Sequence, residues 1–267
     1  MKSLYIGLAA LVVLFGSMNP ASGQQWNFQI VDASGDMGYY SQIAVTSDGT
    51  PYVLYRSSGN SVYLAWWVPA TATWSRIALC GTSASGSFME LLCDANDNLH
   101  FAAYYYLSTP GWGIYYGVFS SLTHSWVLTP ERATSEGGNL DLVLVGSGGN
   151  VTPAIVYLYV GLKVATRNPS NGVWSVSTVY NASGVSGSPS VTADTNGYLH
   201  VSFYDATGAN LMYATNAVGG SWGSQYVDIP GNVGTYSSIV IDTDGKPLIV
   251  YYDVTNGDLK YAKLVSP

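Results

Sequence analysis

The chain has 267 residues, of which only 9% are charged, and a formal net charge of −7. No basic run follows Lys2, which makes nucleic acid and anionic membrane surfaces unfavourable partners. The many Tyr (22) and Gly (30) residues suit short strands joined by tight turns and argue against disorder.

Residues 1–23 have the pattern of a secretory signal peptide. Lys2 precedes the apolar run LYIGLAALVVLF, and Ala21-Ser22-Gly23 offers a small-x-small cleavage site before Gln24. The run is much shorter than the roughly 20 residues of a membrane span. We therefore expect a protein secreted to the extracellular space or periplasm, with a mature domain of residues 24–267 and no membrane insertion after the signal is removed.

A repeat with spacings of 48, 52, 48 and 48 residues covers the mature chain. Its first marker is a tryptophan, at Trp26, Trp74, Trp126, Trp174 and Trp222. Its second is a polar residue that opens a turn, at Thr46, Asp94, Ser147, Asp194 and Asp242. Its third is a small residue, at Ala65, Gly117, Ala165, Ala214 and Ala262. A period near 40–50 residues with four strands per unit is typical of a β-propeller blade.

Each unit is predicted to contain three strands and a fourth that begins at the Trp. In chain order, the predicted elements are a lone strand at 26–32 and then units at 41–77, 89–128, from 141, 188–222 and 237–265. The last unit lacks its fourth strand, which the strand at 26–32 would supply. The predicted fold is therefore an all-β, five-bladed propeller of four-stranded antiparallel blades, closed by the N-terminal strand completing the last blade.

The turns D-T-N-G and D-T-D-G place Gly where a tight hairpin needs a positive φ angle. Calcium binding is the alternative for these turns, but the further ligands and closing Glu of a calcium loop are absent. No Cys/His spacing suggests zinc, so no metal and no cofactor are expected. Cys80 and Cys93 are predicted to be two buried small residues, too far apart on neighbouring units for a disulfide.

Longer loops are expected on the face opposite the tight Gly turns, and ligand sites concentrate on such loops. The candidate ligand-binding residues there are Arg56, Tyr105, Tyr106, Trp112, Asp205 and Asp253. Trp112, placed in a loop between two glycines, would either present a flat face to a sugar ring or fold back over a blade edge. For Asp205 and Asp253 the structural alternative, satisfying loop backbone groups, is the stronger. His100 and His200 repeat in two units, which favours packing over catalysis.

A glycosidase would need two carboxyl groups, about 5–5.5 Å apart in a retaining enzyme or 6.5–9.5 Å in an inverting one. The best available pair is Glu90 and Asp141, on or near the innermost strands of neighbouring units. No G-x-S-x-G nucleophile motif and no metal cluster is present in the sequence. The sequence thus favours a binding protein over an enzyme.

The pattern S-x-x-h-D-x-x-G-x-h-H-V-x-F/Y-Y-D … L-x-Y-A … W, from Ser190 to Trp222 and again from Ser238 to Ala262, resembles repeats of secreted bacterial sialidase-like (BNR-like) propellers. Sialidases proper use an arginine triad and S-x-D-x-G-x-x-W boxes. This chain has no intact box and only Arg56, Arg76, Arg132 and Arg167. In blade count and repeat length it is also similar to five-bladed lectins of the tachylectin type, which implies sugar binding.

We therefore expect a secreted binding module whose partner is a glycan, bound in a lectin-like way on the loop face. One alternative is a propeller-type glycoside hydrolase that uses Glu90 and Asp141. The other is a structural cell-surface or extracellular-matrix part that binds a protein partner.

Overall fold

The computed structural model describes residues 26–80, 88–148 and 150–265. The predicted signal peptide lies outside these residues. The contacts divide the chain into Met1–Val31 and Asp32–Pro267, and the sheets all belong to the second unit. No helix in the described ranges is long and apolar enough to cross a membrane.

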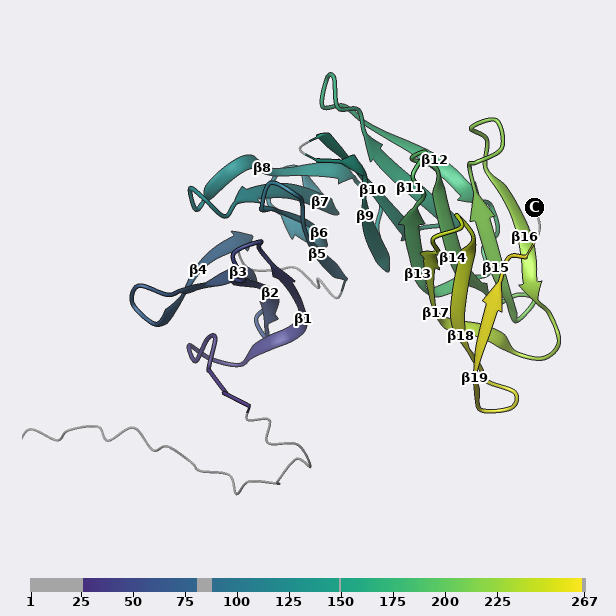
Figure 1. The fold of residues 1–267 in the computed structure, drawn as a ribbon, viewed down its shortest axis with the longest axis horizontal. Helices are drawn as coiled ribbons and strands as arrows, with labels where there is room; N and C mark the ends of the chain where they lie inside the picture. Colours follow the sequence, from purple (N-terminus) through teal and green to yellow (C-terminus); the bar gives the residue numbers. More distant parts are fainter. Residues whose placement is uncertain (1–25, 81–87, 149, 266–267) are drawn as a thin grey trace, which may run out of the picture. The chain divides into compact units, whose positions relative to one another are not determined.

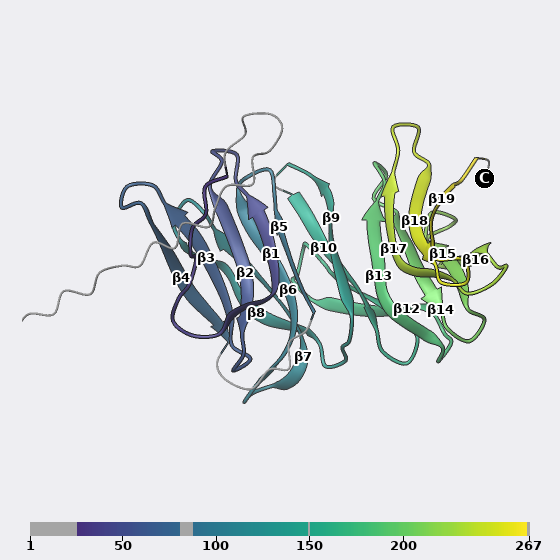
Figure 2. The ribbon, with the colours of Figure 1, turned by 90° about the horizontal axis from the view of Figure 1, so that it is seen from below.

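The regular structure consists of antiparallel sheets of consecutive strands (Figures 1 and 2). The first sheet contains β1 (Met37–Val45), β2 (Pro51–Ser57), β3 (Val62–Val68) and β4 (Thr73–Cys80). The second contains β5 (Met89–Cys93), β6 (Asn98–Leu107), β7 (Gly111–Ser120) and β8 (Ser125–Thr134). The third contains β9 (Leu140–Ser147), β10 (Asn150–Leu158), β11 (Leu162–Arg167) and β12 (Trp174–Tyr180).

The fourth sheet contains β13 (Val185–Ala193), β14 (Leu199–Asp205), β15 (Asn210–Thr215) and β16 (Gly223–Asp228). The fifth contains β17 (Val233–Ile241), β18 (Pro247–Asp253) and β19 (Asp258–Lys263). Five antiparallel sheets in sequence order fit a β-propeller, in agreement with the predicted fold class.

The predicted tight turns are confirmed, and their aspartates cap the turn backbone. Asp194 Oδ1 accepts hydrogen bonds from the backbone N–H groups of Asn196 and Tyr198, both at 2.9 Å. Asp242 Oδ1 accepts the two equivalent hydrogen bonds, from the backbone N–H groups of Asp244 at 2.9 Å and Lys246 at 2.8 Å. These carboxylates are used by the hairpins themselves, which favours the turn interpretation over calcium binding. Among the described residues no group of three metal-ligating side chains occurs.

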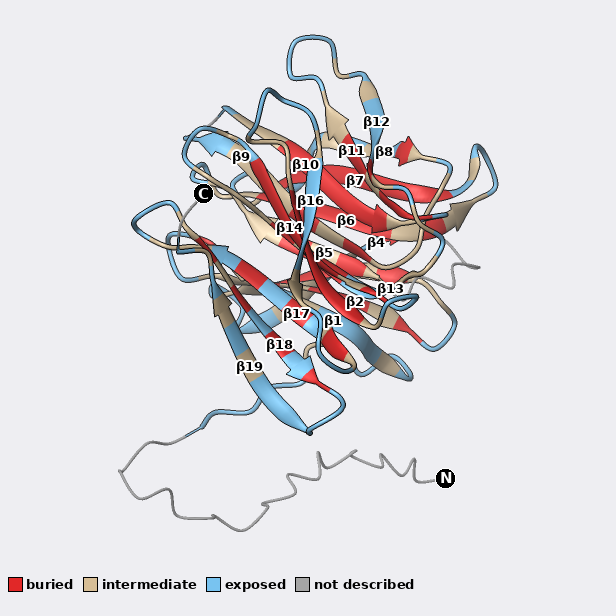
Figure 3. Cartoon of the chain, turned by 90° about the vertical axis from the view of Figure 1, so that its right-hand side faces the viewer, coloured by how far each residue is buried: buried red, intermediate tan, exposed pale blue. Residues whose placement is uncertain are grey.

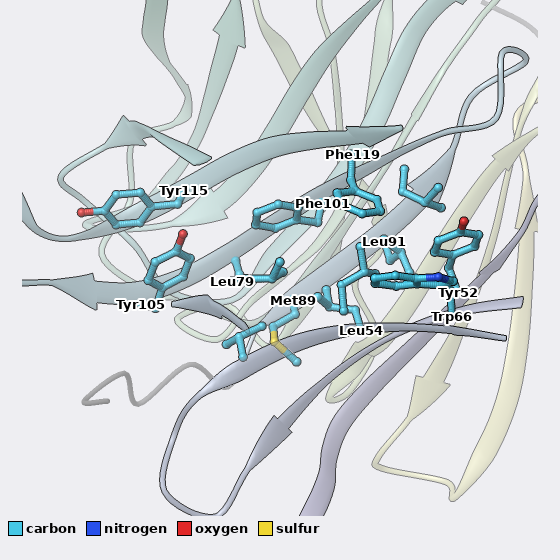
Figure 4. Close-up of a cluster of buried hydrophobic side chains, with 14 residues drawn as sticks. Tyr52, Leu54, Trp66, Leu79, Met89, Leu91, Phe101, Tyr105, Tyr115 and Phe119 are labelled. Carbon is cyan, nitrogen blue, oxygen red and sulfur yellow. The ribbon is translucent and has the colours of Figure 1, made fainter. Parts of the chain in front are cut away.

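The small residue of the third strand lies in the closely packed interior. Ala65, Ala165 and Ala214 are fully buried. A Cβ on Gly117 would lie 2.6 Å from the ring of Phe101, closer than carbon atoms approach. Figure 4 shows this core in the first two sheets, where Phe101 lies among buried aromatic and aliphatic side chains. The third marker of the repeat is therefore a packing requirement.

The predicted strand at 26–32 is not formed in this structure. Residues 26–30 have no strand, and the fifth sheet has three strands in the described chain, not four. A strand is stable only when its backbone groups are paired along an edge. Without such pairing the apolar side chains are exposed, by 78% at Trp26, 88% at Phe28 and 77% at Ile30.

Cys93 ends β5, is half-buried and is free in the structure. Burial, followed by the nearby charges of Asp97 and Asp94, raises the pKa of its thiol to about 11. A thiol held protonated in this way is a poor nucleophile. The side chain of Cys80 lies outside the described residues.

Candidate functional site

The first strands of all five sheets meet at one cavity of about 460 Å³. Each sheet contributes to its lining, for example through Ser41 of β1, Glu90 of β5, Asp141 of β9, Ser190 of β13 and Ser238 of β17. Convergence of every innermost strand on a single cavity is the arrangement expected at a propeller axis. This axial cavity is the candidate functional site. It is lined by Glu90 and Asp141, the two carboxyl groups that the sequence placed on or near innermost strands.

Asp141 is fixed in the wall of the axial cavity. Its Oδ1 accepts a hydrogen bond from its neighbour Leu142 N–H, and its Oδ2 accepts one from Val191 N–H of the next sheet, both at 2.8 Å. Burial raises the pKa of this carboxyl, while these hydrogen bonds act in the opposite direction. Asp141 thus joins β9 to β13 and has a set orientation.

Glu90 is the other carboxyl of the axial cavity. Burial, and secondarily the charge of Asp141, raises its pKa from 4.5 to about 8. Within residues 26–80, 88–148 and 150–265 no hydrogen bond or ion pair to this carboxyl is formed. Glu90 is therefore protonated at neutral pH, and its carboxylic acid is both a hydrogen-bond donor and an acceptor facing the cavity.

Two exposed tyrosines, called the rim tyrosines below, are Tyr40, a lining residue of the axial cavity, and Tyr236, the chain neighbour of another lining residue. Tyr40 in β1 and Tyr236 in β17 are 51% and 85% exposed, and both have positive φ angles, of 52° and 54°. Each occupies the same place in a β-bulge, opposite the second strand of its sheet. A bulky side chain seldom adopts this conformation, and such strain concentrates at functional sites. Tyr40 lines the cavity directly, and Tyr236 precedes the lining residue Ser237.

The predicted loop residue Trp112 lies in strand β7, opposite Tyr106 of β6, and not in a loop. Strand pairing continues this far because Gly113 permits a close approach: a Cβ there would lie 2.2 Å from the Thr134 carbonyl oxygen of β8. The Trp112 side chain is 40% exposed, and its ring lies 5.5 Å from the rings of both Tyr104 and Tyr106. It is therefore the exposed member of an aromatic cluster whose two tyrosines are partly buried.

Three other predicted ligand-binding residues are buried in this structure. Tyr105 is fully buried and stacks on Tyr115 at 4.4 Å. Asp205 is 5% exposed and accepts a hydrogen bond from Thr207 N–H at 3.1 Å. Asp253 is 1% exposed and accepts one from the Asn256 side chain at 2.8 Å. The two aspartates organise their own loops, the structural alternative that the sequence favoured.

Arg56 lies beneath the rim tyrosine of the first sheet. Its guanidinium is 4.8 Å from the ring centre of Tyr40 and 5.6 Å from that of Tyr39. These cation–π contacts support the bulge that carries Tyr40. Arg56 thus borders the site through Tyr40 and is absent from the cavity lining.

The repeated histidines form matched buried networks away from the axial cavity. In the second sheet His100 Nδ1 lies 2.5 Å from the Tyr116 hydroxyl, and Nε2 lies 3.2 Å from the turn carboxylate of Asp94. His200 makes the equivalent contacts, 2.6 Å to Tyr213 and 3.6 Å to Asp194. Burial lowers the pKa of both imidazoles. The same arrangement in two sheets supports a structural role.

Sequence reasoning missed the tyrosines of the rim and the serines of the lining. A signal was present: Gly-x-Tyr-Ser precedes the first strand's apolar run in both GYYSQIAV (38–45) and GTYSSIVI (234–241). The shared Tyr-Ser pair marks a bulge followed by a lining residue.

No protein-family model matches the chain, and no curated protein matches it in sequence. Its structure is similar to the Hadza microbial sialidase Hz136, with a TM-score of 0.55 and 16% identity over 85% of this chain. The chain spans 52% of that sialidase.

Two further solved structures are similar. A protein of unknown function from Dyadobacter fermentans has a TM-score of 0.54 and 12% identity over 88% of this chain and 80% of its own. The Aleuria aurantia lectin, solved with α-methyl-L-fucoside, has a TM-score of 0.53 and 12% identity over 86% of this chain and 75% of its own. At such identities the similarity is one of fold, and the fold that this chain shares with them is the β-propeller.

Proposed function

We propose that the protein is a lectin-like module that binds a carbohydrate at the axial cavity. The observation that carries this proposal is the convergence of five strands on a cavity of about 460 Å³, with exposed Tyr40 in its lining and exposed Tyr236 next to the lining residue Ser237. Export, proposed from residues 1–23, would bring the protein to extracellular glycans. The fold shared with a lectin is compatible with this function and does not by itself establish it.

The chemistry of the site suits a sugar ring. Aromatic faces pack against the apolar C–H face of a pyranose, and serine hydroxyls and carboxyl groups exchange hydrogen bonds with its hydroxyls. Among the described residues that line the cavity there is no Lys, Arg or His, whereas Glu90 and Asp141 are present. Such a lining favours a neutral sugar over one with a carboxylate, such as sialic acid.

Replacing the rim tyrosines tests this function. We expect Tyr40→Ala and Tyr236→Ala each to weaken binding to the glycans recognised on an array by about tenfold, because each loses a stacking surface worth about 1.4 kcal/mol. Tyr198→Ala is the matched control, since this 37% exposed tyrosine lies in a hairpin turn outside the cavity lining. Binding unchanged in both rim variants, or no binding to any glycan, would contradict the proposal.

The Trp112 cluster is proposed as a secondary contact for a longer glycan. Trp112, which is 40% exposed, offers aromatic surface beside Tyr106, whose ring is tilted against it, and is stacked on Tyr104. On the same array, Trp112→Ala should reduce binding of oligosaccharides and leave binding of the monosaccharide unchanged. Loss of monosaccharide binding in this variant would show that the Trp112 cluster is the primary site.

A glycoside hydrolase is the second candidate function. It is favoured by one observation: Glu90, with a pKa of about 8, shares a cavity with Asp141, and a general acid must be protonated at working pH. If it is an enzyme, fluorogenic glycosides should be hydrolysed and Glu90→Gln should lower kcat by at least 100-fold. An absence of turnover across such a panel between pH 5 and 8 would exclude this candidate.

A further inference from the structure

The repeat tryptophan at the fourth strand contacts the preceding sheet at two junctions between sheets. Trp174 of the third sheet packs edge-on against Tyr116 of the second, with ring centres 5.4 Å apart, and its indole N–H donates to Glu131 at 2.7 Å. Trp222 of the fourth sheet donates to Ser177 of the third at 3.4 Å. Trp126 of the second sheet packs against the core cluster that the first two sheets share, with its ring next to Phe101 and Phe119 of its own sheet.

The acceptors of these indole groups occupy equivalent positions. Glu131 pairs with the residue before the small Gly117, and Ser177 pairs with the residue before the small Ala165. This site on the fourth strand therefore carries a hydrogen-bond acceptor in the second and third sheets, whereas in the first sheet it is the apolar Ile77, paired with Leu64. In the fourth sheet the equivalent residue is Gln225, which pairs with Tyr213, the residue before Ala214.

The junction between the fourth and fifth sheets has a pocket at this place. We call it the junction pocket; it measures about 290 Å³, and its lining includes Tyr213, Gln225, Ala262 and Leu264. Tyr213 is equivalent to Tyr116 and Gln225 to Glu131, the two residues that contact Trp174. The junction pocket is thus lined by the counterparts of the two residues that contact Trp174.

We infer that the junction pocket receives the indole of Trp26, and that residues 26–32 add to the free edge of β19 as a fourth strand. Gln225 Oε1 would accept the indole N–H, as Glu131 and Ser177 do for Trp174 and Trp222. The occupant follows from the repeat: WNFQIVD (26–32) matches WGSQYVD (222–228), which contains strand β16, with Trp, Gln, Val and Asp in the same places.

Asp32, the last residue of this segment, already makes the contacts that Asp228 makes at the end of the fourth strand β16. Asp228 accepts hydrogen bonds from Tyr251 of the next sheet, at 2.7 Å, and from Lys260. Asp32 accepts one from Tyr55, the counterpart of Tyr251, at 2.7 Å, and forms an ion pair with Arg76. Asp32 is therefore held at the place where the chain would leave a completed fifth sheet and enter the first sheet.

The edge of β19 also favours an added strand. In the described chain β19 pairs on one side with β18 and has no partner on the other. Leu259 and Tyr261 of β19 are 82% and 59% exposed, and Figure 3 shows this strand as largely exposed. An unpaired edge with apolar side chains promotes association, and proteins normally cover it. A strand from the same chain covers it at the lowest entropic cost.

Ala262→Leu tests the occupancy of the junction pocket. If Trp26 fills it, the larger side chain has no room, and the Tm should fall by about 3–10 °C, as expected for an overpacked core. The matched variant is Ala165→Leu, at the equivalent and fully buried position beside Trp174, which should show a similar fall. A Tm unchanged or raised by Ala262→Leu, with the expected fall for Ala165→Leu, would overturn the inference.

A cysteine pair tests the strand itself. The register of β15 with β16, where Thr215 pairs with Gly223, places Asn27 opposite Lys263. The double variant Asn27→Cys/Lys263→Cys should form a disulfide within the monomer on mild oxidation, because opposed strand residues have the required Cα separation. Asn27→Cys/Lys246→Cys is the control and should not. A disulfide-linked dimer would assign the edge to a second copy, and no disulfide would place residues 26–32 elsewhere; either result overturns the inference.

Discussion

Glu90→Gln should raise the free energy of unfolding at pH 7 by about 3 kcal/mol. The pKa of Glu90 is about 8 in the folded protein, against an ordinary value of 4.5. Between these two values the unfolded chain releases the proton and the folded chain retains it, so the folded state becomes less stable as pH rises. Each pH unit above the pKa of the unfolded chain costs the folded state about 1.4 kcal/mol, and pH 7 lies about 2.5 units above 4.5.

The measurement is denaturant unfolding of both proteins at pH 4, 5.5, 7 and 8. The stability gain from Glu90→Gln should be near zero at pH 4 and should increase up to pH 8. The buried His100 and His200 give the opposite slope, since their lowered pKa values contribute stability that is lost as pH falls below about 6.5. That slope is common to both proteins and cancels in their difference.

Asp244→Asn is the control for this experiment. It removes one negative charge from an exposed turn residue that does not line the axial cavity. We expect its stability to differ from that of the native protein by no more than about 0.5 kcal/mol at every pH. If Glu90→Gln gives the same flat profile as this control, then Glu90 is ionised at neutral pH, and the general-acid role of the second candidate function also fails.

Gly234→Ala should destabilise the fold by about 3–5 kcal/mol. Gly234 has a φ of +107°, and a Cβ there would lie 2.6 Å from the Cα of the fully buried Leu211. A left-handed conformation costs a residue with a small side chain about 1–2 kcal/mol, and the overlap with backbone adds about 2–3 kcal/mol. Urea unfolding monitored by tryptophan fluorescence would measure the change.

Gly49→Ala separates the two causes. Gly49 also has a positive φ, of +86°, but nothing lies within 4 Å of the Cβ position in its hairpin turn. This variant should lose only the conformational part, about 1–2 kcal/mol. Equal losses in the two variants would show that the fourth and fifth sheets can separate to accommodate a methyl group at Gly234.

The recurrence of particular residue types made the fold predictable. Asp194 and Asp242 mark hairpins because their carboxylates bond the turn backbone locally, within four residues. Ala165 and Ala214 mark third strands because neighbouring sheets leave no room for a larger side chain. Each requirement acts through the same local geometry in every unit, so it repeats along the sequence.

The candidate site was predictable only in part. Glu90 and Asp141 were expected near the axis because they lie on first strands, and both line the axial cavity. Tyr105 was misplaced because Tyr104, Tyr105 and Tyr106 are alike, and alternation does not tell which of three tyrosines faces inward. The pairing of β6 with β7 decided that Tyr105 is buried and Trp112 exposed.

By itself the sequence determined the repeat, the order of the strands and the chemistry of the turns, because these depend on neighbours a few residues away. Only the tertiary structure decided that Tyr40 and Tyr236 project from bulges beside one cavity. It alone also placed Glu90 where burial raises the pKa of its carboxyl group. The position of a bulge and the desolvation of a carboxyl group depend on how strands distant in the chain pair and pack. The sequence of a single segment does not specify which strands these are.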